Sequence, residues 1–277
     1  MKHPLTFGCQ AYPWSVYFRD RGLTLDDRLE EALAACAAAG LTNWEHLAVP
    51  TPAEAPAFCD RLRQHGLEMA SCYHNAQLHD AAAAAVIADL VARSAASHAF
   101  GLRVLVVNPT PIRWGGPEDK DDTQLRLQAK NLDDLGQRLA DVGVTLAYHT
   151  HAPEMRAGAR EFHHMMNATA PEHVSLCVDA QWMHRGCGNS MVAVEDILRL
   201  YGDRVASLHV RQTRGGIWTE VVEDGEVDWR WIATHLSRKG FSGPVILEAA
   251  AEKGTPQTLP MADAVRLSLG YVRPLFA

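Results

Sequence analysis

Short apolar runs alternate along the chain with longer stretches in which alanine and leucine recur between polar residues. The short runs have the length of strands, and their continuous apolar character is typical of strands that are buried on both faces. They lie at residues 5–9, 42–47, 67–73, 102–108, 144–149, 174–179, 205–210 and 244–248. This pattern predicts eight parallel strands.

The intervening stretches have helical length. They lie at residues 25–39, 52–65, 81–100, 123–142, 160–169, 192–201, 229–239 and 262–275. In five places one glycine separates a helical stretch from the next strand: Gly40, Gly66, Gly101, Gly143 and Gly240. A helix end often needs a residue with positive φ, which glycine adopts without a Cβ clash. Eight strand and helix units in series predict one α/β domain over residues 1–277, a (β/α)8 TIM barrel, with an open parallel sheet as the alternative.

The composition of the chain indicates which kinds of binding partner and which cellular location to expect. Of the 277 residues, 47% are hydrophobic and 21% charged, which is ordinary for a globular domain. The net charge of -7 and the absence of a Lys/Arg-rich stripe argue against a nucleic-acid partner. No signal-peptide pattern or bilayer-length apolar stretch is present, so we expect a cytoplasmic protein without a membrane partner. The six cysteines show no C-x-x-C spacing and are expected to be free thiols.

Candidate metal ligands end four of the predicted strands. Asp179 ends the run VSLCVD, His209 lies in VASLH, and Glu248 ends PVILE. In a parallel barrel the carboxyl ends of all strands meet at one rim, so these side chains should converge. Buried carboxylates repel one another unless a cation joins them, which favours a divalent metal over the alternatives of a salt bridge or a helix N-cap.

The fourth ligand is open between two residues of the segment YHTHAPE. His149 ends the strand, whereas Glu154 lies far enough into the loop to fold back over the barrel mouth. A carboxylate from Glu154 would complete a set suited to Mn²⁺, Mg²⁺, Co²⁺ or Zn²⁺, and His149 would then be a fifth ligand or a proton carrier. The alternative for Glu154 is a surface pair with Arg156.

Motifs along the whole chain carry a resemblance to a known family. They are GCQAYPWS, GLTNWEHL, YHTHAPE, VDAQWMHRG, GDRVASLHVR, GEVDWRWI and GPVILEAA. With these motifs the chain resembles the xylose isomerase-like TIM barrel superfamily, and within it the sugar phosphate isomerase/epimerase and inosose dehydratase-like groups. The resemblance implies one divalent metal ion held by Glu154 or His149 together with Asp179, His209 and Glu248.

Three positions depart from the family pattern. His149 stands where many relatives have glutamate, and Trp182 stands where others have the histidine of D-x-x-H, a role that His184 can take over. Where relatives often have H-x-K-D, this chain continues from His209 to Arg211 and Gln212, which keeps a cation near the metal and loses the acid.

The resemblance implies a small-molecule sugar or polyol substrate and, for some members, a homo-oligomer. Residues at strand ends and in mouth loops are the candidate substrate contacts. They are Trp14, Glu45, His74, Asn108, His151, His184, Arg211 and Trp218. We also expect residues 215–218, which contain two glycines, to form a lid.

A metal-dependent isomerase or epimerase is the predicted function. A cation bound to neighbouring hydroxyl and carbonyl oxygens acidifies the adjacent C–H, and a base takes the proton to give a metal-stabilised enediolate. Glu248, Glu154 and His149 are the candidate catalytic residues. A dehydratase or lyase of a keto-inositol or 3-keto-sugar shares this intermediate and is the first alternative. The others are a silent sugar-binding barrel and a phosphodiesterase resembling endonuclease IV, which the net charge disfavours.

Overall fold

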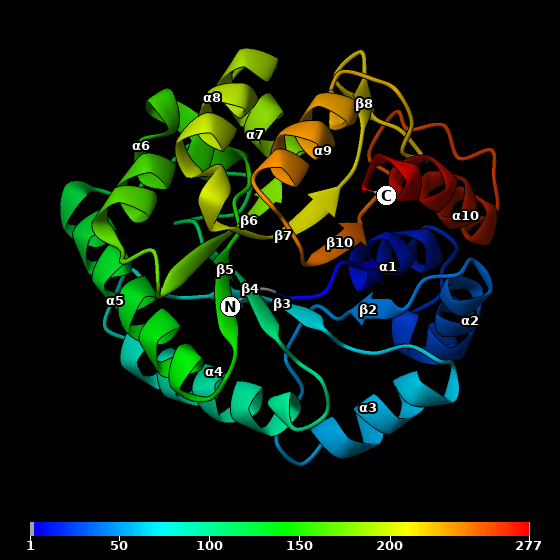
Figure 1. Cartoon of the computed structure of the whole chain (residues 1–277), viewed down its shortest axis with the longest axis horizontal. Helices are drawn as coiled ribbons and strands as arrows, with labels where there is room; N and C mark the ends of the chain where they lie inside the picture. The colour runs from blue at the N-terminus through cyan, green and yellow to red at the C-terminus, as the bar shows by residue number, and fades with distance from the viewer. Residues whose placement is uncertain (1–2, 277) are drawn as a thin grey trace.

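Eight parallel strands form a nearly closed barrel, and the helices surround it. The computed structural model describes residues 3–276. The barrel strands are β1 (Thr6–Gln10), β2 (Asn43–Glu45), β3 (Ser71–Ala76), β4 (Val104–Pro109), β5 (Thr145–Tyr148), β6 (Val174–Asp179), β7 (Val205–Val210) and β10 (Pro244–Leu247). Figure 1 looks along the barrel, with the strands at the centre and the helices around them. The TIM barrel prediction is confirmed.

The strand order decides between a barrel and an open sheet. The order is β2-β1-β10-β7-β6-β5-β4-β3. The first strand of the chain, β1, therefore pairs with the last barrel strand, β10. The two edges, β2 and β3, meet through backbone hydrogen bonds from Trp44 N to Glu68 O (2.9 Å) and from Tyr73 N to His46 O (2.9 Å). These bonds nearly close the ring, which excludes the open-sheet alternative.

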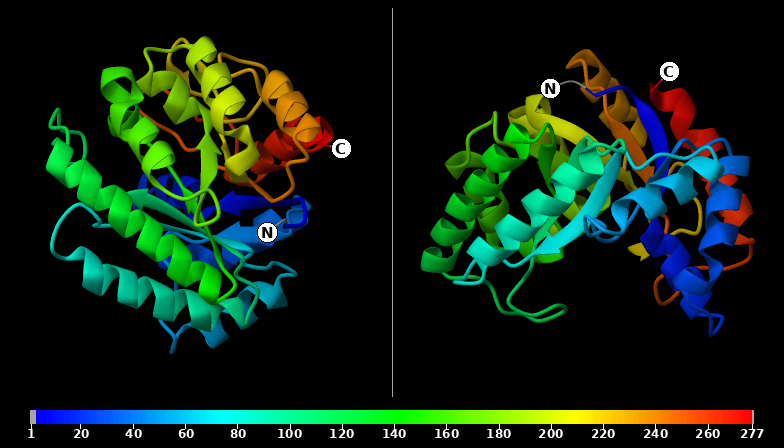
Figure 2. Two further views of the ribbon diagram at one scale, coloured as in Figure 1. Left: turned by 60° about the vertical axis from the view of Figure 1, so that its left-hand side comes forward. Right: turned by 90° about the horizontal axis from the view of Figure 1, so that it is seen from below.

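Helices cover the outer face of the barrel, as both views in Figure 2 show. They are α1 (Ala11–Arg19), α2 (Leu25–Ala38), α3 (Ala55–Gln64), α4 (Ala83–His98), α5 (Asp122–Asp141), α6 (Ala152–Ala168), α7 (Ala180–Gly186), α8 (Met191–Tyr201), α9 (Trp229–Arg238) and α10 (Met261–Val272), with 3-10 turns at Gly202–Arg204 and Arg273–Phe276. None of the helices among the described residues combines the length and apolar character that a bilayer crossing requires.

The two largest of three clusters of buried apolar residues build the barrel core. The larger one lies between barrel and helices and includes Leu105, Leu146 and Leu176, all buried. The smaller one fills the barrel with short side chains such as Ala147 and Cys177, which leaves space toward the carboxyl-end rim. Apolar burial is the dominant stabilising term in such a layered domain.

The glycine signals at helix ends are confirmed, because Gly40, Gly66, Gly101, Gly143 and Gly240 all have positive φ. The six cysteines are free thiols, as predicted.

Two helices, α1 and α7, were not predicted, nor were the two short antiparallel strands β8 (Thr213–Arg214) and β9 (Ile217–Trp218). The expected lid at residues 215–218 is part of this hairpin. Gly215 and Gly216 take positive φ values of 61° and 73° at its turn, a conformation that two-residue hairpins favour.

Candidate metal centre and substrate cavity

Four polar side chains meet at the carboxyl ends of four neighbouring strands. His149 follows β5, Asp179 ends β6, His209 lies on β7 and Glu248 follows β10. Each offers one ligand atom, and these atoms all lie within 4.8 Å of one another. All four residues are buried. The structure thus brings together the predicted set with His149, rather than Glu154, as its fourth member.

The two carboxylate oxygens of Asp179 have different surroundings. Oδ1 accepts a hydrogen bond from the backbone N–H of Trp182 (3.0 Å) and so caps the first turn of α7. Oδ2 has no hydrogen-bond partner among the described residues and lies 3.7 Å from His149 Nε2. The N-cap and ligand readings of the sequence are therefore compatible, because each uses a different oxygen.

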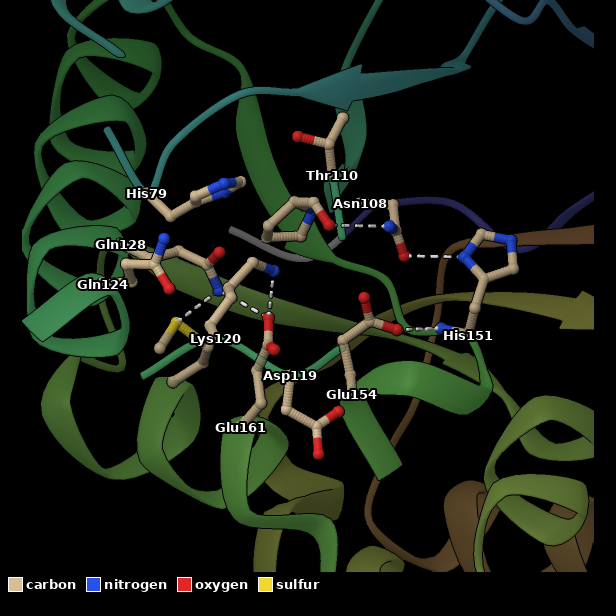
Figure 3. Close-up of polar contacts among 12 residues, drawn as sticks. His79, Asn108, Thr110, Asp119, Lys120, Gln124, Gln128, His151, Glu154 and Glu161 are labelled. Carbon is tan, nitrogen blue, oxygen red and sulfur yellow. Dashed lines mark hydrogen bonds and ion pairs between the residues drawn. The ribbon is translucent and has the colours of Figure 1, made fainter. Parts of the chain in front are cut away.

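Asn108 orients two histidines. Its Oδ1 lies 3.3 Å from His149 Nδ1 and 2.8 Å from His151 Nδ1, and its Nδ2 donates to the carbonyl of Pro109 (2.9 Å). Figure 3 shows the contact between Asn108 and His151. Since this oxygen only accepts, both Nδ1 atoms carry a proton and both Nε2 atoms keep a lone pair. Burial lowers the pKa of both imidazoles, which favours their neutral form.

His209 lies between two carboxylates. Its Nδ1 is 2.8 Å from Glu248 Oε2 and its Nε2 is 2.7 Å from Glu45 Oε1. Burial disfavours the charged imidazole, but Cys177, Glu45 and Glu248 outweigh burial and raise the pKa of His209. With Nδ1 as ligand, Nε2 would lie next to the carboxylate of Glu45, as in the carboxylate–histidine–metal arrangement that fixes a ligand's tautomer.

Glu45 was predicted to contact substrate. Its carboxylate instead contacts His209 of the four-residue cluster and two other residues. Its Oε2 accepts from Ser71 Oγ (2.6 Å), and its Oε1 accepts from Gln10 Nε2 (3.1 Å). The side chain is fully buried and does not line the cavity. Glu45 therefore orients His209 instead.

Arg211 is a buried cation beside the acidic ligands. Its guanidinium pairs with Glu248 Oε1, and its Nε lies 3.3 Å from Asp179 Oδ2. Burial opposes ionisation of Glu248, but Arg211 and His209 overcome it and lower the pKa of this carboxyl to about 2. The NH1 atom of Arg211 is buried and has no partner among the described residues.

Glu154 is not a member of the four-residue group, which corrects the prediction that it folds over the barrel mouth. Helix α6 begins at Ala152, so Glu154 lies in its first turn, and its Oε2 accepts from the backbone N–H of His151 (2.7 Å; Figure 3). A side-chain acceptor in this place satisfies a backbone N–H that has no partner within the helix. Burial, with a smaller effect of Glu161, raises the pKa of Glu154 to about 7.

A cavity of about 590 Å³ opens above the cluster. Its lining includes Glu248 of the cluster and the predicted contacts His151, Arg211 and Trp218. It also includes residues that were not predicted to contact substrate: Gln10, Tyr12, Tyr73, Trp114, Arg156 and Trp182. Gln10 ends β1 as Glu45 ends β2, so the strand-end rule would have found it.

Five of the eight predicted substrate contacts do not line the cavity. Glu45 and Asn108 contact histidines of the cluster instead, as described above, and three others lie elsewhere. Trp14 is buried in α1, where its ring packs 5.7 Å from that of Phe18, because the expected mouth loop is a helix. His74 is directed to the backbone of Val49, whose N–H donates to its Nδ1 (3.5 Å). His184 is buried in α7 and does not line the cavity.

The donor set fits a divalent cation. Two imidazoles and two carboxylates are ligands that Mn²⁺, Co²⁺ and Zn²⁺ accept, and the carboxylates suit Mg²⁺ as well. The Nε2 of His149 and Oδ2 of Asp179 are buried without a hydrogen-bond partner in the described part of the chain. Buried polar atoms are normally satisfied, and a shared cation would satisfy both.

Comparisons with known proteins agree with this architecture. The profile of a family described as xylose isomerase-like TIM barrel matches residues 33–274. The chain is 28% identical over 184 residues to an inosose dehydratase of Lacticaseibacillus casei, covering 55% of this chain and 59% of that protein. It is 26% identical over 269 residues to the rhizopine catabolism protein MocC of Rhizobium meliloti, covering 86% and 79%. The match thus spans about three fifths of the length of the L. casei dehydratase.

Solved structures share the fold at low identity. A xylose isomerase-like TIM barrel protein from Mycobacterium smegmatis in complex with magnesium superposes with a TM-score of 0.74 at 14% identity, covering 99% of this chain and 98% of that one. The 3-keto-D-glucoside 4-epimerase YcjR of E. coli superposes with a TM-score of 0.69 at 14% identity, covering 98% and 99%. At such identity the likeness concerns the fold alone.

Proposed function

Since this chain belongs to the xylose isomerase-like TIM barrel family, we propose that it is a divalent-metal-dependent isomerase or epimerase of a sugar, ketose or keto-polyol. The observation that carries the proposal is the convergence of four buried ligand atoms at one point beside an open cavity. Relatives and structural neighbours named as inosose dehydratases and a keto-sugar epimerase support sugar or polyol chemistry in general. Binding would involve His149, Asp179, His209 and Glu248.

A bound divalent cation would acidify the C–H next to the substrate carbonyl and favour the enediolate. The protein's own residues then have to move the proton. His151 reaches the cavity, its Nδ1 faces Asn108, and burial keeps its imidazole neutral, so its Nε2 is available as a base. His151 thus joins Glu248 as a candidate proton acceptor.

Glu248 is a weaker base as long as Arg211 holds it, because the paired carboxylate has a pKa of about 2. If the guanidinium turns its NH1 edge to a substrate oxygen, Glu248 regains basicity at the moment when the proton must be taken. Arg211 would then also stabilise the negative charge that develops on that oxygen. Glu154 accepts a backbone hydrogen bond and does not line the cavity, which disfavours it as the base.

The second candidate is a dehydratase of a keto-inositol or 3-keto-sugar. It is favoured by the similarity to inosose dehydratases, which extends over 86% of the chain for the Clostridium botulinum protein at 23% identity. Dehydration uses the same proton abstraction and adds loss of a β-hydroxyl group.

Deuterium exchange tests the proposal. The metal-loaded protein should incorporate solvent deuterium next to the carbonyl of at least one ketose, 3-keto-sugar or keto-inositol, as followed by NMR. Formation of an epimer or isomer supports the first candidate, whereas loss of water supports the second. If the protein binds metal but no compound of the panel exchanges deuterium, only the alternative of a catalytically silent sugar-binding barrel remains.

A further inference from the structure

An unbroken row of aromatic rings borders the cavity. Trp114 lies 5.2 Å from His151, His151 lies 5.1 Å from Trp182, and Trp182 lies 5.4 Å from Trp218, measured between ring centroids. The four rings come from the β4–α5 loop, the β5–α6 loop, α7 and β9. At one end the row contacts Arg211, whose guanidinium carbon lies 4.4 Å from the Trp218 centroid. We call this row the aromatic wall.

The wall is held at both ends. Arg156 donates to the carbonyls of Gly116 (2.9 Å) and Glu118 (3.1 Å) and so fixes the loop that carries Trp114. Arg185 donates to the carbonyl of Gly216 (2.9 Å) in the hairpin that carries Trp218. A binding surface that is fixed before the ligand arrives loses less entropy on binding.

Buried charge at the metal end leaves no place for an anionic substrate group. Three buried carboxylates, Glu45, Asp179 and Glu248, face one buried guanidinium, Arg211. A divalent cation makes this set neutral when the imidazoles are neutral. A further unpaired charge in such a buried site is costly.

The other cation of the lining is already paired. Arg156 NH2 lies 2.6 Å from Asp119 Oδ1, and its remaining contacts are backbone carbonyls. Among the described lining residues, the cationic group without a partner is therefore Nη1 of Arg211. It can stabilise one negatively charged oxygen that develops during the reaction. A phosphate or a carboxylate would have no counter-ion of its own.

From this wall and this charge balance we propose that the substrate is an uncharged keto-sugar glycoside with an apolar or aromatic group at the anomeric oxygen, rather than a sugar phosphate or a sugar acid. The inference rests on the proposed function and specifies its substrate class. The keto-sugar ring lies over Glu248 and Arg211, and the substituent extends along the wall toward Trp114. The cavity volume of about 590 Å³ falls in the range of about 300–1,000 Å³ typical of drug-sized ligands, which accommodates a two-part molecule.

Calorimetric titration of the Mn²⁺-loaded protein tests this. The probes are 3-keto-D-glucose, its phenyl β-glycoside and its 6-phosphate. The phenyl glycoside should bind at least tenfold more tightly than the free keto-sugar, and the 6-phosphate at least tenfold more weakly. Equal affinity for the phenyl glycoside and the free sugar, or tighter binding of the phosphate, would overturn the inference.

Substitution of Trp114 tests whether the aromatic wall causes the preference for the phenyl glycoside. Trp114→Ala should abolish most of the preference for the phenyl glycoside over free 3-keto-D-glucose. Trp114 is 52% exposed, so its loss should not impair folding. Trp231→Ala, on α9 and outside the cavity lining, is the matched control and should retain the preference. A preference that survives Trp114→Ala contradicts the assignment of the wall.

The two proposals fail separately. A phenyl preference without deuterium exchange would refute the catalytic function and keep the ligand class. Exchange without the preference would keep the function and refute the ligand class.

Discussion

Two buried polar clusters lie at opposite ends of the segment from His149 to Glu161, and they differ in how their charges are matched. The first is the four-residue metal cluster at the rim of the barrel. The second lies between α5 and α6, where Lys120 Nζ pairs with Glu161 Oε1 (2.7 Å) and Gln128 Nε2 donates to the same oxygen (2.8 Å; Figure 3). The opposite charges of Lys120 and Glu161 cancel each other.

The metal cluster has an excess of carboxylates and ligand atoms without partners. Its members come from four strands, whereas Lys120 precedes α5 and Glu161 lies on α6, so that their pair ties a loop to a helix. The difference shows that burial of charge alone does not identify a functional site. Unmatched charge with free lone pairs beside a cavity is what makes the first cluster the candidate functional site.

The largest effect should follow removal of a ligand. Asp179→Asn and Glu248→Gln should each lower turnover by at least about 10³-fold, equivalent to about 4 kcal/mol, and weaken Mn²⁺ binding in calorimetry. His163→Ala is the control, because His163 contacts the hydroxyl of Tyr201 (2.9 Å) on the outside of the barrel. Equal losses in all three variants would contradict the assignment.

Lys120→Met should lower the free energy of unfolding by about 3–5 kcal/mol, since it leaves the buried Glu161 without a counter-charge. Urea unfolding measures this. Replacement of both partners, Lys120→Met with Glu161→Leu, should recover a large part of the loss. Mn²⁺ affinity should remain unchanged in the folded protein, and a large change in it would remove the distinction between the two clusters.

Glu154→Gln should stabilise the protein in a pH-dependent way. The raised pKa, about 7 against an ordinary 4.5, means that the folded state prefers the protonated carboxyl. No penalty exists below pH 4.5, and the penalty grows as pH rises to about 7, where it reaches about 3 kcal/mol. Glutamine keeps the acceptor for His151 N–H and carries no charge, so the variant should gain that amount at pH 8.5 and almost nothing at pH 4.

Urea unfolding at the two pH values checks the Glu154 prediction, with the exposed Glu172→Gln as control. A gain that does not depend on pH would show that ionisation of Glu154 is not its cause.

Asn108→Ala should have the smallest effect, a loss of about 10–100-fold in Mn²⁺ affinity, because the proton of His149 Nδ1 loses its acceptor. Asn108→Asp keeps an acceptor at this position and should retain most of the affinity. If both variants bind Mn²⁺ like the wild type, Asn108 does not orient His149.

The sequence by itself determined the barrel and much of its rim. Continuous apolar runs specify buried strands, and the glycines at helix ends specify where each helix stops. Because parallel strands bring their carboxyl ends to one rim, Asp179, His209 and Glu248 could be placed together from their positions alone. The predicted boundaries of β6 and β7 coincide with those of the structure.

Only the tertiary structure decided which group completes the cluster and what surrounds it. Helix α6 begins directly after His151, whose backbone N–H donates to the carboxylate of Glu154, and His149 faces Asp179. Pairing of Arg211 with Glu248 and the row from Trp114 to Trp218 join segments far apart in the chain. Local sequence patterns determine strands and helix caps. Contacts between distant loops depend on the direction in which the closed barrel holds each side chain, and local patterns do not contain that information.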